Sequence, residues 1–161
     1  SDTGALTRLS EFLPADAKIV SSDLIRTRET ANAIQGARER LPDHPGLREF
    51  NFGLWDGLPF DEISERWPDL SRSYWETPGD IAPPEGESWN ESEARVSAAV
   101  ADLLQDAGPH LICVAHFGAI LTQVRRALDV SAEEVLAHKI DTLSVTCIPP
   151  NGPPKMINHI P

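Results

Sequence analysis

The chain of 161 residues carries 25 acidic and 14 basic residues and has a formal net charge of −11. Its length suits a single domain with a substantial core, expected to span residues 1–161. The acidic balance excludes classes of protein that depend on a basic surface, so neither nucleic acid nor an anionic membrane is an expected partner. Cys113 and Cys147 lie in apolar runs and are expected to be buried and reduced. No apolar run has the length of a membrane helix and no signal peptide is recognisable, which favours a cytoplasmic location.

Segments with a helical period alternate with short apolar segments that suggest strands. In the first half of the chain we expect a helix over residues 5–13 that Pro14 ends, a strand over 18–21, a helix from 24 to about 36 and a short helix over 59–67. In the second half we expect a long helix over 90–105, a strand from 111, a helix after 118 and a capped helix from 131. Two strands, over 143–148 and 155–160, are expected at the end. This alternation predicts an α/β fold, a three-layer sandwich with a mostly parallel sheet and helices on both faces. The last two strands should pair antiparallel at the edge of that sheet.

Apolar spacing also indicates which side chains face the core. The positions expected to be buried are Leu24, Ile25, Ala31 and Ile34 on the second helix and Val96, Val100, Leu103 and Leu104 on the long helix. Residues 58–88 contain many prolines, glycines and acids and are predicted to form an insertion over the crevice at the end of the sheet. Trp75 and Trp89 are interpreted as side chains that anchor this insertion to the core.

The first candidate for chemistry is Arg26, in the string Ser21-Ser22-Asp23-Leu24-Ile25-Arg26. It is expected in the first turn of a helix, directly after a short strand. A cation at that end opposes the helix dipole and needs a compensating charge, which a bound phosphate would provide. The alternative is that Arg26 and Arg28 belong to an ordinary solvated helix face.

The second candidate is Glu49, a carboxylate flanked by Phe50, Phe52 and Trp55. Aromatic neighbours disfavour the ionised form of a carboxyl group, and a carboxyl that keeps its proton near neutral pH can serve as a general acid. An ordinary surface glutamate is the alternative.

The third candidate is His116, which ends an apolar strand and precedes Gly118 and a further helix. The carboxyl ends of parallel strands form the ligand crevice of an α/β sheet, and the free N–H groups of a helix N-terminus attract anions. A phosphate group would fit there. The alternative is a histidine with a structural role only.

The three segments, in this order, resemble the histidine phosphatase superfamily, whose fold is also called phosphoglycerate mutase-like. The resemblance covers residues 1–145 and includes a fourth string, Pro84-Glu85-Gly86-Glu87-Ser88, before a long helix that contains Arg95. The resemblance implies that Arg26 and His116 bind phosphate. It also implies that His116 and Glu49 are catalytic and that Glu49 is the proton donor. Neither a metal nor a cofactor is implied. The adjoining side chains are expected to form the substrate pocket: Phe50, Trp55, Glu87, Ser88 and Phe117.

The nucleophile of the family has no counterpart in this sequence. In the family, the first strand ends in Arg-His-Gly, whose histidine becomes phosphorylated, and no such string occurs here. The resemblance therefore implies about two dozen residues upstream of Ser1, including the central first strand of the sheet. Phe117 is a second departure, because the family usually has a small residue there; its ring would narrow the pocket.

The resemblance implies a phosphomonoester hydrolase that acts through a phosphohistidine on a small phosphorylated metabolite. Mutases of the family have a basic residue directly after the glutamate, where this chain has Phe50, and this favours a phosphatase. The acidic insertion is similar to that of the branch that includes alpha-ribazole phosphatase. A mutase-type phosphotransferase stays an alternative, as does a non-catalytic phosphate-binding or interaction protein if the nucleophile is lacking. A homodimer is an open alternative to a monomer.

Overall fold

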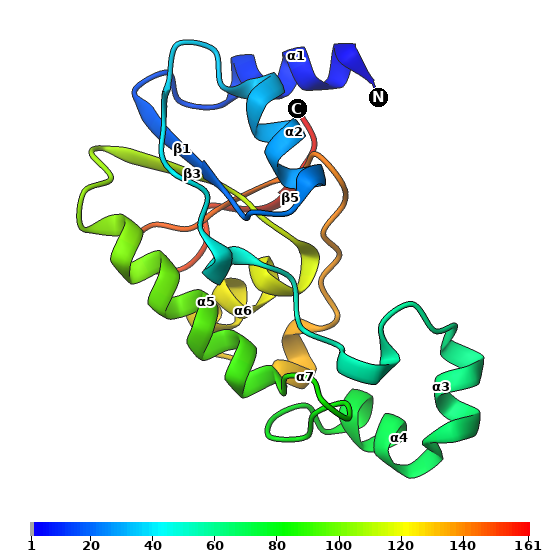
Figure 1. The fold of residues 1–161 in the computed structure, drawn as a ribbon. Helices are drawn as coiled ribbons and strands as arrows, with labels where there is room; N and C mark the ends of the chain where they lie inside the picture. The colour runs from blue at the N-terminus through cyan, green and yellow to red at the C-terminus, as the bar shows by residue number, and fades with distance from the viewer. Residues whose placement is uncertain (1) are drawn as a thin grey trace.

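The computed structural model describes residues 2–161, and its centre is a parallel sheet of three strands in the order β2-β1-β3 (Figure 1). The middle strand β1 (Ala17–Ser21) pairs with β3 (His110–Val114) along its whole length, with Ala17 opposite His110 and Ser21 opposite Val114. On its other side β1 pairs with β2 (Glu39–Arg40), which the sequence analysis does not predict. A strand of two charged residues carries no apolar signal; only its pairing with β1 defines it.

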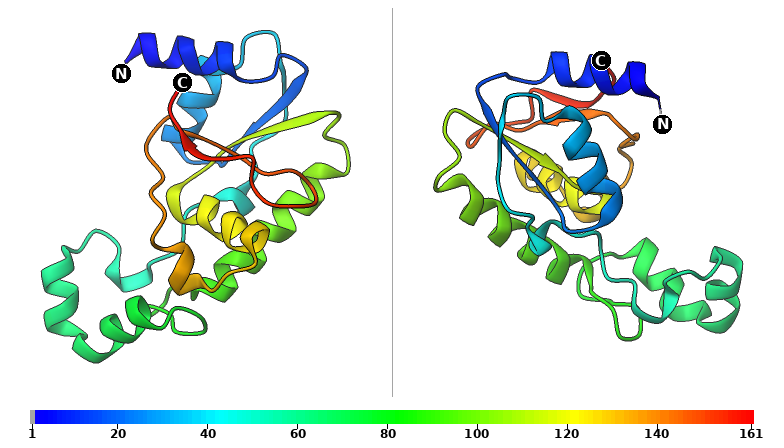
Figure 2. Two further views of the ribbon diagram at one scale, coloured as in Figure 1. Left: turned by 180° about the vertical axis from the view of Figure 1, so that it is seen from behind. Right: turned by 45° about the horizontal axis from the view of Figure 1, so that its top comes forward.

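Helices cover both faces of this sheet, as predicted. Consecutive residues of β1 point to opposite faces. Ile19 packs against α1 (Thr3–Phe12) and α2 (Ile25–Ile34) in a cluster with Leu9 and Ile34. Val20 packs in a second cluster with Ala99 of α5 (Trp89–Leu104). Figure 2 shows α1 and α2 on one side of the strands and α5 and α6 (Phe117–Leu128) on the other. The fold class predicted from the sequence is confirmed.

The two C-terminal strands form a sheet of their own. β4 (Val145–Cys147) and β5 (Met156–His159) pair antiparallel, as predicted, but they are not hydrogen-bonded to the parallel sheet, so the predicted place at its edge is wrong. Val145 packs with the cluster around Ile19, and Ile157 packs with the cluster around Leu121. The side chains of the hairpin thus extend the hydrophobic clusters around Ile19 and Leu121. Among the described strands, β3 pairs with β1 alone.

Two side chains expected in the core are exposed. Ile25 is 72% exposed because the buried stripe of α2 consists of Thr27, Ala31 and Ile34, and Ile25 lies off that stripe. Leu104 is 47% exposed and is the last residue of α5, whereas Leu103 before it packs against the cluster around Val20.

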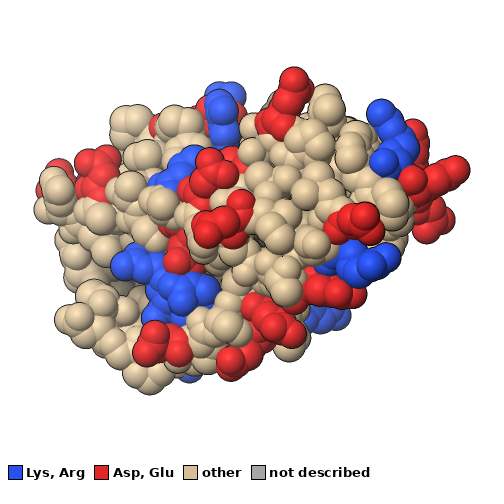
Figure 3. All heavy atoms as spheres, turned by 90° about the horizontal axis from the view of Figure 1, so that it is seen from below, with Lys and Arg blue, Asp and Glu red and all other residues tan. Residues whose placement is uncertain are grey.

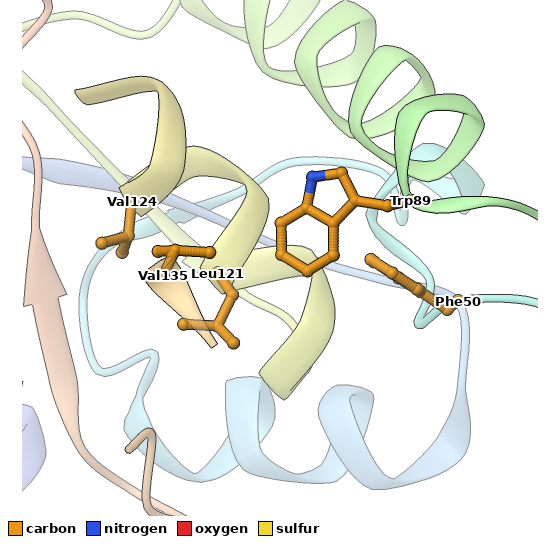
Figure 4. Close-up of a cluster of buried hydrophobic side chains, with 5 residues drawn as sticks. All are labelled: Phe50, Trp89, Leu121, Val124 and Val135. Atoms are coloured by element: carbon orange, nitrogen blue, oxygen red, sulfur yellow. The ribbon is translucent and has the colours of Figure 1, made fainter. Parts of the chain in front are cut away.

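The predicted insertion is largely helical. α3 (Phe60–Arg66) and α4 (Pro68–Glu76) form a lobe that projects from the layered body (Figure 1), with Trp55, Ile63 and Tyr74 in its own small core. Trp89 is buried edge-on against Phe50, with ring centroids 5.4 Å apart, beside Leu121 of α6 (Figure 4). Trp75, in contrast, is 43% exposed and does not anchor the lobe to the core. α7 (Ala132–Val135) follows the predicted cap at Ser131. Over residues 2–161, no helix combines the length and the apolar character that crossing a membrane requires.

Candidate active site

His116 lies at the junction between β3 and α6, where the sequence predicts it. It is the N-cap residue of α6, and its side chain is only 6% exposed. Its Nδ1 atom is 3.1 Å from Nη2 of Arg26, and its Nε2 atom is 2.8 Å from Oγ of Ser22. Arg26 lies in the first turn of α2, directly after β1. Because β1 and β3 are adjacent and parallel, their carboxyl ends bring the two predicted phosphate-binding residues into contact.

The hydrogen bonds of His116 define its tautomer. A guanidinium can only donate, so Nδ1 accepts from Arg26, and the neutral ring then carries its proton on Nε2 and donates it to Ser22. The Ser22 hydroxyl is 2.6 Å from that of Thr27, which in turn donates to the Leu24 carbonyl at 2.9 Å. Burial lowers the pKa of His116; Glu49 opposes the shift, and Arg26 adds to it. The ring is therefore neutral at physiological pH.

This shift predicts that the protein loses stability as the pH falls. The unfolded chain takes up a proton on His116 near the ordinary pKa of 6.5, whereas the folded protein takes it up only at lower pH. The unfolded state thus binds more protons between the two pKa values, and the free energy of unfolding falls as the pH drops through this window. Denaturant unfolding at pH 8 and pH 5.5 should show this loss, and a smaller loss for His116→Gln. His110→Gln, at an exposed histidine, is the control. If the His116 variant keeps the full pH dependence, another group causes it.

Glu49 occupies the N-terminus of α6. Its Oε2 atom accepts from the N–H of Gly118 at 3.1 Å, and its Oε1 atom accepts from the N–H groups of Ala119 and Phe50 at 3.2 and 3.0 Å. From the sequence, the N–H groups at this helix terminus were predicted to be free for a phosphate. The prediction is wrong for Gly118 and Ala119, whose N–H groups are bonded to Glu49. The protein supplies its own carboxylate to this end of the helix dipole. Glu49 is thereby fixed next to His116.

Gly118 leaves the space that the Glu49 carboxyl group needs. A Cβ atom at residue 118 would lie 2.5 Å from Oε1 of Glu49 and 3.1 Å from the Phe50 ring. Gly118→Ala is therefore expected to displace Glu49, with a loss of activity on phosphate esters far larger than its effect on stability. Steady-state kinetics and thermal unfolding would measure the two effects. Gly79→Ala, where the nearest heavy atom to the new Cβ is 3.8 Å away, is the matched control. Full activity in the Gly118 variant would show that the position of Glu49 does not matter.

The predicted pocket residues Glu87 and Ser88 instead support the segment that carries Glu49. Glu87 forms an ion pair with Arg95 at 2.8 Å and accepts from the N–H of Asn51, while Arg95 also donates to the carbonyls of Gly46, Arg48 and Glu49. Burial disfavours ionisation of Glu87, but the hydrogen bonds from Arg95 and Asn51 outweigh it and lower its pKa. Ser88 is buried and caps α5 in a capping box with Glu91.

A cavity of about 100 Å³ opens beside Glu49. Of the side chains predicted for the pocket, Phe50 and Phe117 line it, whereas Trp55, Glu87 and Ser88 do not. Trp55 is buried in the core of the α3–α4 lobe, in edge contact with Tyr74. Ser22, Thr27 and Tyr74 were not predicted to take part in the site. The position of Ser22 within the string that contains Arg26, and of Thr27 directly after it, could have indicated these two residues.

The surface carries charges of both signs. On the face seen in Figure 3, acidic side chains are scattered widely, and basic side chains occur in small groups beside them. Arg48 is paired with Asp23 and Arg95 with Glu87, whereas Arg26 contacts neutral His116. Within residues 2–161, no group of three or more histidine, cysteine, aspartate or glutamate side chains is arranged to hold a metal ion.

An arginine and a histidine at the carboxyl ends of adjacent parallel strands are typical of α/β proteins that bind phosphate groups. Comparison of the sequence with known families agrees with this class. Residues 4–158 match the histidine phosphatase superfamily (branch 1), and the chain belongs to this family.

Curated relatives include a bifunctional protein and several mutases. The chain is 33% identical over 134 residues to a bifunctional protein of Mycobacterium tuberculosis, a match that covers 81% of this chain and 36% of the relative. It is 30% identical over 132 residues to the 2,3-bisphosphoglycerate-dependent phosphoglycerate mutase of Bartonella henselae, covering 76% of this chain and 63% of the mutase. The chain thus spans less than two thirds of either relative.

Solved structures of similar fold support the same family. YhfR of Bacillus stearothermophilus superimposes with a TM-score of 0.79 and 26% identity, over 91% of this chain and 76% of YhfR. The alpha-ribazole phosphatase of Shigella flexneri superimposes with a TM-score of 0.78 over 97% of this chain and 81% of that enzyme. The identity to the latter is 18%, so that likeness concerns the fold alone.

Proposed function

We propose that the whole protein hydrolyses small phosphate monoesters through a phosphohistidine intermediate. The observation that supports this most is the contact of Arg26 with His116, next to a Glu49 carboxyl group that backbone N–H groups hold in place. A guanidinium fork can bind two phosphoryl oxygens at once, and its positive charge stabilises the negative charge that develops on the phosphoryl group. These side chains supply positive charge and proton transfer, so the proposed reaction is independent of a metal.

The proposed reaction has two steps. In the first, the nucleophile is a histidine of the Arg-His-Gly string that the family resemblance implies for the whole protein. Its nitrogen bonds to phosphorus while the ester P–O bond breaks, and Glu49 gives its proton to the leaving alkoxide. In the second, Glu49 takes a proton from water as the water oxygen bonds to phosphorus and the P–N bond breaks. Arg26 holds the phosphoryl oxygens in both steps.

Hydrolysis is favoured over mutase activity by Phe50. This residue is buried and apolar where mutases carry a basic residue, so it offers no charge to a substrate carboxylate. The mutase of Bartonella henselae is nevertheless among the relatives, which makes phosphotransfer the second candidate function. Addition of a bisphosphorylated primer distinguishes the two, because a mutase then isomerises phosphoglycerate faster than it releases phosphate.

The proposed function predicts that the whole protein releases phosphate from an aryl phosphate in the presence of EDTA. Rapid quenching during turnover should trap a phosphoryl group that is labile in acid and stable in base, as expected for a phosphohistidine. If the activity is lost on chelation and restored by a divalent ion, the metal-independent mechanism is wrong. If phosphate esters bind without turnover or labelling, the protein is a non-catalytic phosphate-binding protein instead.

A further inference from the structure

The cavity beside Glu49 has an apolar wall. It is formed by Phe52 from the segment after Glu49, Trp75 and Pro78 from the lobe and its loop, Phe117 and Leu121 from α6, and Leu136 after α7. Glu49 is the one charged side chain among the described lining residues. Glu49 and Gly118 connect this cavity to the contact of His116 with Arg26, so the group attached to a phosphate held by Arg26 would contact aromatic and aliphatic surfaces.

The arginines nearby do not offer charge to a substrate at this cavity. Arg95 is engaged by Glu87 and by three backbone carbonyls, and Arg48 is paired with Asp23. The Tyr74 side chain, which also lines the cavity, is only 5% exposed, and burial raises its pKa to about 12, so its hydroxyl stays neutral. A second negative charge on a substrate would enter an apolar cavity that already holds a carboxyl group, and this is unfavourable.

Trp75 provides the solvent-exposed edge of this wall. Its ring is 43% exposed and stands edge-on to Tyr74, with centroids 4.8 Å apart. A large aromatic side chain left half in water next to a cavity gains apolar contact when a ligand covers it. The lobe that carries it has its own core of buried side chains, which includes Ile63 and Tyr74 but not Trp75.

We infer that the substrate is a phosphate ester of an uncharged, apolar alcohol whose size is close to one aromatic ring, and that Trp75 contributes to this specificity. This inference rests on the proposed phosphatase function and adds to it the class of the leaving group. The cavity of about 100 Å³ is smaller than the enclosed apolar cavity of about 150 Å³ that binds benzene, but it is open to solvent, so one ring can enter it in part and be covered at its mouth by Trp75.

The test compares two esters of nearly equal size that differ in charge. In 4-(2-methylpropyl)phenyl phosphate and 4-(carboxymethyl)phenyl phosphate, the phenols have similar acidity and the ring substituents have the same number of non-hydrogen atoms. The whole protein should hydrolyse the first with a kcat/KM at least about tenfold higher. Trp75→Ala should reduce this ratio several-fold by lowering kcat/KM for the uncharged ester. Phe60→Ala, a matched change at a 62% exposed ring of the same lobe outside the cavity, should leave the ratio unchanged. Thermal unfolding checks that both variants are folded.

Binding of phosphonates gives a readout that needs no turnover. Benzylphosphonate should bind more tightly than methylphosphonate to the wild-type protein, and the difference should shrink in Trp75→Ala. Two results would overturn the inference while leaving the phosphatase function intact. One is equal kcat/KM values for the two aryl esters, and the other is equal affinities for benzylphosphonate and methylphosphonate. Absence of hydrolysis of any ester, together with a preference for benzylphosphonate, would contradict the proposed function and leave the apolar site supported.

Discussion

Glu49→Gln is expected to lower the turnover of phosphate esters with poor leaving groups by about 10²–10⁴-fold, the usual contribution of general acid–base catalysis. Glutamine has the shape of glutamate and can still accept a hydrogen bond from the Gly118 or Ala119 N–H, but it cannot pass a proton to the departing oxygen. The loss should therefore appear in kcat, with the fold retained.

A series of leaving groups makes this prediction specific. An ester such as 4-nitrophenyl phosphate, whose leaving group needs little protonation, should lose much less activity in the Glu49 variant than an alkyl ester. Glu85→Gln, at an exposed carboxylate in a neighbouring segment, should leave both activities unchanged. Equal losses for good and poor leaving groups would mean that Glu49 has a structural role and transfers no proton.

Arg26→Ala is expected to lower kcat/KM by about 10²–10³-fold and to weaken inhibition by vanadate and inorganic phosphate. The variant loses both bonds of the guanidinium fork, which should tighten further as charge develops in the transition state. Arg26→Lys keeps the positive charge but loses the planar fork, so its activity should lie between that of the wild-type protein and that of Arg26→Ala. Arg28→Ala is the matched control, because Arg28 lies on the same helix and pairs with Asp43 at 3.0 Å. If Arg26→Ala retains normal turnover and normal anion inhibition, Arg26 is not part of the site.

His116→Ala should reduce turnover and anion inhibition in the same way, and its effect should not add to that of Arg26→Ala. The two side chains are in direct contact, and His116 holds the guanidinium of Arg26 in place by accepting its hydrogen bond, so the two residues are coupled. A double-mutant cycle on the inhibition constant of vanadate measures this coupling. Additive losses would show that the two side chains bind the anion independently.

The local elements could be read from the sequence because short-range physics determines them. Pro14 follows the C-terminus of α1, and the serines at 88 and 131 cap the helices that begin after them. The apolar run that ends before His116 specifies a strand, and β1 was predicted to within one residue. Since the carboxyl ends of parallel strands meet at one edge, the order of the motifs was enough to predict that Arg26 and His116 would lie together.

Contacts between distant segments were decided only by the tertiary structure. Glu87 and Ser88 carry polar side chains near an expected pocket, but whether they face a ligand or the backbone depends on Arg95 and Glu91, which engage them. In the same way, Glu49 fills the helix terminus that a phosphate was expected to fill, because its chain segment passes within reach of Gly118, 69 residues away in the sequence. Periodicity and capping signals act over a few residues and determine which elements form. Which polar partner each side chain finds depends on how those elements pack, and no local signal in this sequence specifies that.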